Sequence, residues 1–266
     1  MMRSIIGFAF AALATTAIAT TAITTSVMAA DMPVKSRPTP PPAPVYNWTG
    51  CYIKGGGGYG MWNQDTTAFE DSFQIGPEIR TGGRGWFGTV GGGCDYQIGE
   101  RWVIGVFGDY DFSSIKGDFA ASLDGLVIGG QEKLTSAWAV GGRIGYLITP
   151  AVLTYISGGF TEARFSGVEL TVFSNPPELF DRRTNRHTFS GWFLGSGFEY
   201  DFGWFPGLFW RTEYRFASYE KDNLLIVESP SGSRTGLSVD SEKFVQTIRS
   251  ELVWRFNWGS PARASY

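Results

Sequence analysis

The chain contains eight segments in which apolar and polar residues alternate with a period of two, the side-chain period of a β-strand. The segments are Thr49–Met61, Trp86–Ile98, Trp102–Phe112, Thr135–Leu147, Ala151–Phe165, Phe189–Phe202, Gly207–Tyr219 and Phe244–Trp258. The links between them are alternately long and short. The long, polar links are Asn63–Gly85, Ser113–Leu134, Ser166–Thr188 and Glu220–Lys243, and the short links are Gly99–Arg101, Ile148–Pro150 and Gly203–Pro206. Because a sheet that closes through a membrane has turns on one side and loops on the other, this asymmetry predicts an all-β, eight-stranded antiparallel up-and-down transmembrane barrel.

Segment length and composition agree with that prediction. The segments are roughly 11 to 15 residues long, enough for tilted membrane strands, whereas strands of soluble proteins average about 5 to 6 residues. Charged residues make up 18% of the chain, and aromatic residues make up 16%. A soluble domain usually has about 25% charged residues. We therefore expect one face of each strand to meet lipid, and a soluble β-sandwich is the alternative fold.

The charged residues of the segments indicate which face points inward. A basic side chain at the bilayer midplane costs about 2–4 kcal/mol on a barrel's lipid face, whereas charges of both signs can pair inside the lumen. We expect a luminal ion network formed by Asp95, Asp109, Asp111, Arg143, Glu162, Arg164, Glu199, Asp201, Arg211, Glu213, Arg215, Arg249, Glu251 and Arg255. We also expect an aromatic girdle of Trp48, Trp102, Tyr200, Trp204 and Trp258 near the strand ends that the short turns join.

The N-terminal residues have a different character from the eight segments. Residues 1–29 combine a basic start, an uncharged apolar stretch and small residues at 27–29, which is typical of a secretory signal peptide; a membrane anchor helix is the alternative. Residues 30–47 are rich in proline and are expected to form an extended periplasmic spacer. Residues 48–266 would then form the barrel, with both of its ends in the periplasm because the strand number is even. We expect a Gram-negative outer-membrane location.

The start of the first segment, Asn47-Trp48-Thr49-Gly50-Cys51-Tyr52-Ile53-Lys54-Gly55 behind a proline-rich leader, resembles the alphaproteobacterial outer-membrane immunogenic protein family. Similar stretches occur at 195–200, 211–214 and 255–259, so the resemblance extends from residue 31 to residue 266. It implies a small opacity-type barrel of the broad porin family, with exposed loops and no agreed enzymatic activity. Cys51 and Lys54 depart from the usual pattern.

Cys51 and Cys94 are the two cysteines of the chain. They lie on the same face near neighbouring ends of the first two segments, which would be antiparallel partners. Directly opposed residues have Cβ atoms about 4.5–5.5 Å apart, and the periplasm is oxidising. We therefore hypothesise a cross-strand disulfide; two lipid-facing thiols are the alternative.

The sequence contains no decisive catalytic motif. His187 is the single histidine, and Thr188 or Ser190 beside it would have to converge with it and an acid to form a hydrolase site. We expect no enzymatic activity, cofactor or metal, and a net charge of −3 does not suggest a nucleic-acid partner.

The first hypothesis for the function is a structural surface barrel that contacts outer-membrane lipids, lipopolysaccharide, the barrel assembly machinery and, through its loops, host or surface ligands. A narrow channel and a lipid-modifying enzyme are the alternatives.

Overall fold

The computed structural model describes residues 47–123, 125–172 and 178–256, except the side chains of 178–180. The predicted signal peptide, residues 30–46 of the spacer, and Trp258 lie outside these residues. The strands are β1 (Gly50–Glu70), β2 (Phe73–Gln74), β3 (Ile79–Ile98), β4 (Trp102–Leu123), β5 (Leu126–Thr149), β6 (Val152–Phe165), β7 (Val168–Val172), β8 (Glu178–Thr184), β9 (His187–Asp201), β10 (Leu208–Glu228) and β11 (Arg234–Phe256). Within the described ranges, no helix is long and apolar enough to span a bilayer.

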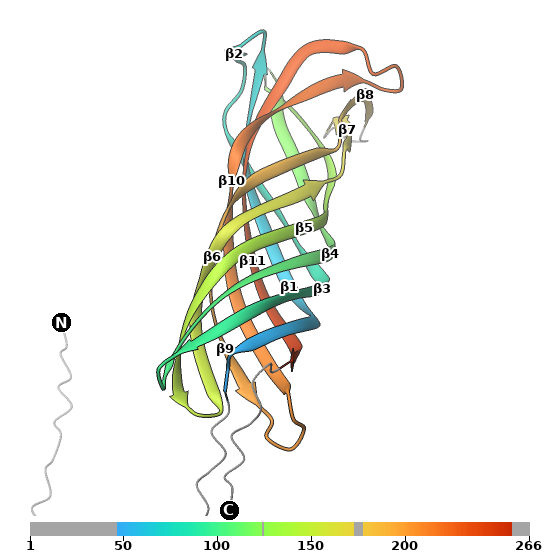
Figure 1. Cartoon of the computed structure of the whole chain (residues 1–266). Coiled ribbons are helices and arrows are strands. Elements are labelled where there is room, and N and C mark those ends of the chain that lie inside the picture. The colour runs from blue at the N-terminus through green and yellow to red at the C-terminus, as the bar shows by residue number, and fades with distance from the viewer. Residues whose placement is uncertain (1–46, 124, 173–177, 257–266) are drawn as a thin grey trace, which may run out of the picture. The chain divides into compact units, whose positions relative to one another are not determined.

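Eight of the strands form a closed antiparallel ring (Figure 1). Its order is β1, β3, β4, β5, β6, β9, β10 and β11. The ring closes where β11 pairs with β1, in a ladder that runs from Cys51 opposite Phe256 to Glu70 opposite Leu237. Closure leaves no strand edge in the lipid, where an unpaired backbone group would be costly. The predicted eight-stranded transmembrane barrel is thereby confirmed.

The two ends of the barrel differ as the links predicted. At one end, which we call the turn end, short turns connect β3 to β4, β5 to β6 and β9 to β10. Gly99 lies in the first of these turns with a φ of +62°, a backbone conformation that glycine adopts without steric cost. The first residue of β1 and the last of β11 are also at the turn end. The opposite end, which we call the loop end, carries the tips of the longer hairpins.

The half of the barrel nearer the turn end is apolar outside. Large apolar and aromatic side chains are exposed on the outer face of all eight ring strands, and together they form an apolar band. The band includes Ile53, Trp86, Val90, Tyr96, Trp102, Ile104, Val106, Tyr110, Phe112, Val140, Ile144, Ile156, Phe160, Trp192, Leu194, Phe198, Trp210, Tyr214, Ile248, Leu252 and Trp254. This is the pattern of a sheet whose outer face meets lipid and whose inner face is polar.

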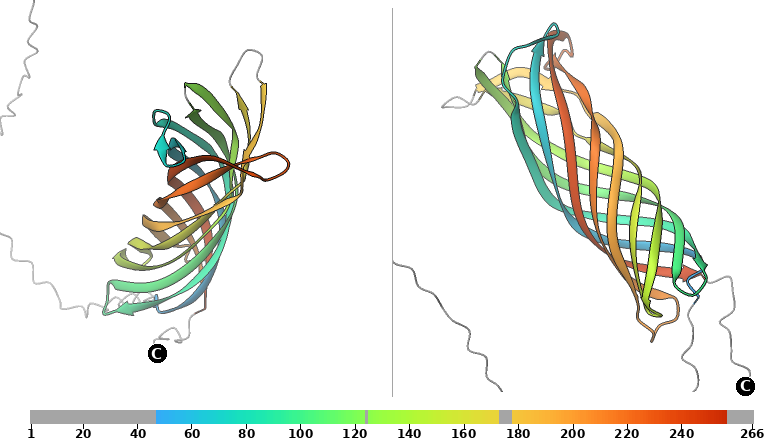
Figure 2. Two further views of the ribbon diagram at one scale, coloured as in Figure 1. Left: turned by 90° about the horizontal axis from the view of Figure 1, so that it is seen from above. Right: turned by 90° about the vertical axis from the view of Figure 1, so that its left-hand side faces the viewer.

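The half nearer the loop end corrects one prediction. The four long links were expected to be surface loops, but most of their residues extend the strands, so that β1, β3, β4, β5, β10 and β11 are 20 to 24 residues long (Figure 2). Here the polarity is inverted. The inner face is mostly apolar, with Ile115, Phe119 and Val239 buried, while outward residues such as Lys116 and Asp240 are polar. Outward polar residues meet water above the lipid, so these segments resemble loops in composition although most of their residues still alternate between the two faces.

The hairpin β7–β8 completes the wall of the barrel in the half nearer the loop end, which we call the upper half. β6 and β9 end at Phe165 and His187, and the chain then continues through β7 and β8. β7 pairs with β5 and β8 pairs with β10, so the hairpin bridges the gap between these two long strands. The inner face of the hairpin buries Val168 and Leu170 in the apolar interior of the loop end.

Candidate functional site

In the half of the barrel nearer the turn end, which we call the lower half, the lumen is filled with charged side chains. The structure buries eleven of the fourteen predicted network residues there: Asp95, Asp109, Asp111, Arg143, Glu199, Arg211, Glu213, Arg215, Arg249, Glu251 and Arg255. Lys54 joins them from β1. These twelve residues form two groups, which we call the lower and middle ion clusters.

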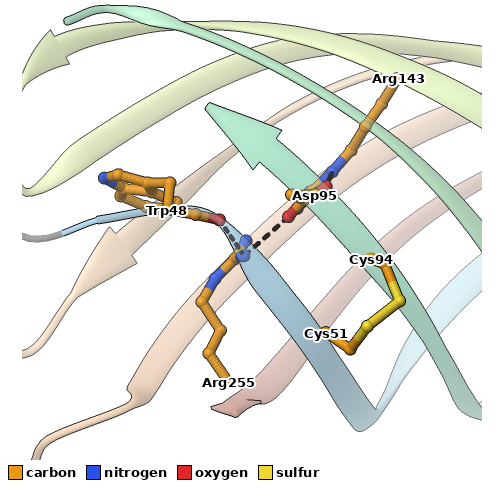
Figure 3. Close-up of a disulfide and its surroundings, with 6 residues drawn as sticks. All are labelled: Trp48, Cys51, Cys94, Asp95, Arg143 and Arg255. Atoms are coloured by element: carbon orange, nitrogen blue, oxygen red, sulfur yellow. Dashed lines mark hydrogen bonds and ion pairs between the residues drawn. A yellow bond between two sulfur atoms is a disulfide. The ribbon is translucent and has the colours of Figure 1, made fainter. Parts of the chain in front are cut away.

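The lower ion cluster, nearer the turn end, is built around two carboxylates. Glu199 is fully buried and accepts hydrogen bonds from three guanidinium groups. The donor-acceptor distances are 2.6 and 2.9 Å from Arg211, 2.6 and 2.8 Å from Arg255, and 3.2 Å from Arg143. Asp95 binds Arg143 through both carboxylate oxygens and lies 2.7 Å from Arg255 (Figure 3). Three cations therefore share two anions in one connected group.

Two tyrosines pack against the arginines of the lower cluster. The guanidinium of Arg211 lies 4.7 Å from the ring centroid of Tyr52, and that of Arg143 lies 4.9 Å from the ring of Tyr155. Both are within the range of a cation–π attraction. Glycines make room for the rings: a Cβ atom at Gly93 would lie 2.6 Å from the Tyr52 hydroxyl oxygen, and one at Gly197 would lie 2.8 Å from that of Tyr155. The glycine-rich strands thus allow aromatic rings to fill a narrow lumen.

The middle ion cluster is centred on Asp109. Arg215 donates to both of its oxygens at 2.8 and 2.9 Å, and Lys54 Nζ lies 3.0 Å away. Lys54 also donates to Glu251 at 3.1 and 3.2 Å. The cluster is completed by Glu213, which accepts from Arg215, and by Asp111, which accepts from Arg249. Phe107 and Phe193 cover it, with Arg215 4.4 Å from the Phe193 ring centroid.

The two clusters together contain equal numbers of basic and acidic side chains, six of each. Burial of unpaired charges would cost several kcal/mol for each ion, and pairing offsets much of that cost. Above the middle cluster, a cavity of about 30 Å³ is lined in part by Asp111, Arg215 and Tyr219. Such a volume holds about one or two water molecules. The lower lumen is therefore packed with balanced charges.

A third buried group, which we call the lysine cage, lies at the base of the loop end. Lys243 Nζ donates to Glu132 at 2.9 and 3.0 Å and to Gln64. Its ammonium lies 5.2, 4.4 and 5.0 Å from the ring centroids of Trp62, Phe165 and Phe189. Sequence reasoning missed this group because Lys243, Gln64 and Glu132 were assigned to loops. The inward phase set by Arg249 and Glu251 on β11 includes Lys243 and was the available signal.

Three predicted network residues are elsewhere, which corrects the prediction for them. Arg164 is exposed on the outer face of β6, and Glu162, half-buried on the same face, accepts a hydrogen bond from the Trp138 indole at 3.2 Å. Both lie near the upper edge of the apolar band, where an outward charge reaches water instead of lipid. Asp201 ends β9 and accepts a hydrogen bond from the Gly203 backbone in the turn at 2.9 Å.

Trp48 also differs from its predicted role in the girdle. It is fully buried, its ring lies 4.9 Å from the Arg255 guanidinium carbon, and its indole donates to the carbonyl of Pro150 at 3.2 Å. It therefore covers the turn end of the lumen beside the lower cluster (Figure 3). Trp102, Tyr200 and Trp204 are exposed on the outside.

Cys51 and Cys94 are directly opposite each other on β1 and β3. Their sulfur atoms are bonded at 2.03 Å. The disulfide lies on the outer face of the barrel, and Asp95, the next residue after Cys94, points inward to Arg143 (Figure 3). The bond thus joins the first and second ring strands at the level of the lower cluster.

The residues around His187 do not assemble into a triad in the described part of the chain. His187 Nε2 lies 2.6 Å from a carboxylate oxygen of Asp222, and the pair is partly exposed at the loop end. No hydrogen bond joins His187 to Thr188 or Ser190 among the described residues. Across the same residues, no group of three or more His, Cys, Asp or Glu side chains is placed to hold a metal ion.

A closed ring of eight tilted strands with an apolar outer band and a charged, packed lumen defines a small membrane barrel of the outer-membrane type. The sequence leads to the same class. The model of the outer membrane protein β-barrel domain family matches residues 10–256, and the chain belongs to this family. It is accordingly located in the outer membrane of a Gram-negative cell.

Several known proteins are similar to this chain. The 31 kDa outer-membrane immunogenic protein of Brucella melitensis is 28% identical over 266 residues, covering 96% of this chain and 100% of that protein. This similarity confirms the resemblance to the immunogenic proteins. An uncharacterised protein of Coxiella burnetii is 31% identical over 217 residues, covering 74% of this chain and 79% of that protein. The crystal structure of OprG from Pseudomonas aeruginosa gives a TM-score of 0.48 at 12% identity, covering 78% of this chain and 97% of that chain.

Proposed function

We propose that this protein is a structural, surface-exposed barrel that contributes to the integrity of the outer membrane and makes surface contacts through its loop end. In this proposal the turn end and both termini lie in the periplasm. The observation that carries the proposal is the filled lumen: two ion clusters whose charges balance together, the covering rings of Phe107 and Phe193, and the lysine cage occupy its successive levels. A protein built to pass solutes would keep that space open.

The same observation argues against a narrow channel, the principal alternative. A permeant ion would have to displace arginines that are hydrogen-bonded to buried carboxylates at 2.6–2.9 Å. Removing one partner of a buried ion pair costs about 3–5 kcal/mol.

An enzymatic role receives less support, because the partly exposed pair of His187 and Asp222 lacks a nucleophile among its described hydrogen-bond partners.

Orientation is tested by inserting a short epitope at one of two exposed sites in the full-length protein. One site is the β10–β11 tip, residues 229–233, and the matched site is the turn at residues 203–206. We expect antibody to label intact cells that carry the tip insertion, and to label the turn insertion only after the outer membrane is permeabilised. The reverse pattern would contradict the proposed orientation.

The envelope role is tested by deleting the gene and measuring sensitivity to detergents and uptake of a large hydrophobic dye. We expect both to rise and to return to normal when the wild-type protein is supplied. Unchanged sensitivity and unchanged dye uptake in the deletion strain would contradict a contribution to envelope integrity.

A further inference from the structure

Three basic side chains lie side by side on the outer face of three adjacent strands. Arg84 of β3 is directly opposite Lys116 of β4, and Lys116 is directly opposite Lys133 of β5. We call these three residues the basic row. Like charges that are directly opposite in a sheet destabilise it. No ion pair joins any of the three to an acidic residue in the described part of the chain.

Two other exposed basic residues at the loop end do have acidic partners. Arg80 lies four residues before Arg84 on β3 and forms an ion pair with Asp65 at 2.6 Å. Lys221 forms an ion pair with Asp240 at 3.0 Å. Arg84, Lys116 and Lys133 are directly opposed like charges without an acidic partner among the described residues, which indicates that an external anion completes the basic row.

The basic row lies at the upper edge of the apolar band. Trp86, which is 71% exposed, follows Arg84 by two residues on the outer face of β3, and Phe112, 60% exposed, precedes Lys116 on β4. On the neighbouring strand β6, Arg164 is also exposed on the outer face. Aromatic side chains typically mark the membrane–water interface, so the row is at the level of lipid headgroups.

Neighbouring strands are about 4.8 Å apart, so the three basic side chains span roughly 10 Å. Arginine and lysine both bind phosphate, and arginine can do so with two parallel hydrogen bonds. We propose that the basic row binds the phosphate groups of a phosphorylated glycolipid of the outer leaflet, that is, the lipid A part of lipopolysaccharide. The choice of leaflet rests on the orientation proposed above.

The test uses the full-length barrel refolded in phosphatidylcholine nanodiscs and measures binding of bisphosphorylated lipid A. In the test variant Arg84, Lys116 and Lys133 are all replaced by glutamine. Each basic residue near a membrane surface contributes about fivefold to the affinity for anionic lipid, so we expect the triple variant to bind lipid A at least tenfold more weakly. The matched control, Arg80→Gln with Lys221→Gln, removes two exposed but ion-paired charges and should leave binding within about twofold of wild type.

A stability measurement separates loss of the site from loss of the fold. Because the substitutions remove opposed like charges, the triple variant should resist heat in phosphate-free detergent at least as well as wild type.

The assignment is overturned if the triple variant keeps wild-type affinity, if lipid A without phosphates binds equally well, or if millimolar inorganic phosphate abolishes binding. Epitope labelling of cells settles orientation independently. If the loop end faces outward and lipid A still fails to bind, only the lipid site is wrong; if it faces inward, the proposed orientation is wrong.

Discussion

Replacing Glu199 with glutamine should destabilise the barrel more than any other single loss of charge at the turn end. Glu199 is fully buried and accepts five hydrogen bonds from Arg143, Arg211 and Arg255. Glutamine keeps the shape but removes the negative charge, leaving Asp95 as the one carboxylate for three buried cations. Breaking a buried ion pair from one side costs about 3–5 kcal/mol. This loss corresponds to an increase in the unfolding equilibrium constant of roughly 160- to 5,000-fold.

The measurement is urea unfolding of the barrel refolded in lipid vesicles, followed by tryptophan fluorescence. The matched control is Glu162→Gln, because sequence reasoning assigned both glutamates to the lumen and the structure places Glu162 on the outer face. Its single hydrogen bond from the Trp138 indole can also be accepted by a glutamine oxygen, so we expect a change below about 1 kcal/mol. Equal, small effects for the two variants would refute the ion-pair account.

A double variant tests whether Glu199 and Arg211 stabilise each other. Glu199→Gln combined with Arg211→Gln removes the anion together with the cation that donates two of its five hydrogen bonds. The double variant should therefore be more stable than the sum of the two single losses predicts, by about 0.5–3 kcal/mol. Strict additivity would mean that these two side chains do not stabilise each other in the folded barrel.

Three further predictions concern other parts of the barrel. Because 43 residues separate Cys51 from Cys94, serine at both positions should lower the free energy of unfolding by about 2–4 kcal/mol, and alkylation should change the mass of the wild-type protein only after reduction. Gly197→Ala should cost about 1–3 kcal/mol in urea unfolding, since its Cβ atom would lie 2.3 Å from a backbone oxygen of the neighbouring strand; unchanged stability would show that the strands move apart freely. The hydrogen bond from Arg80 lowers the pKa of Asp65, so the stability that this pair contributes is complete above the unfolded-state pKa near 4 and is lost as the pH falls through the lower folded-state pKa. Arg80→Gln should make the melting temperature less dependent on pH below pH 4, and an unaltered dependence would contradict the role of this pair.

The fold was largely predictable because a period of two holds in the part of every ring strand nearer the turn end. Strands that cross lipid have apolar residues outside, so each charged residue in the middle of a segment, such as Asp109 or Glu251, also indicated which face points inward. The same rule failed near the strand ends. Glu162 and Arg164 are above the apolar band, where outward charges reach water, and so their charge carries no information about the face.

The strand extensions were missed for a related physical reason. Beyond the membrane the outer face becomes polar and the inner face buries mostly apolar residues, so the polarity inverts, and irregularities on β5 and β10 also shift the inward phase by one residue. On β4, Ile115 and Phe119 continue the inward phase and Lys116 lies between them, but average polarity there is that of a loop. On β11, where the alternation is unbroken, following the phase would have found the extension and with it Lys243.

The pairing of individual charges could not be predicted from the sequence. Which arginine binds which carboxylate depends on strand tilt and register, which bring together residues as distant as Lys54 and Glu251. The buried position of Trp48 likewise depends on how the chain enters the barrel across the lower cluster. The sequence therefore predicts which charged residues line the lumen, but only the three-dimensional structure shows how they pair and fill it.

The most direct test of the closed lumen is the conductance of the purified, refolded protein in a planar lipid bilayer at neutral pH. The packed ion clusters predict no steady open-channel current in the wild-type barrel. Reproducible, sustained current steps from the wild-type protein, with the disulfide intact, would contradict the account.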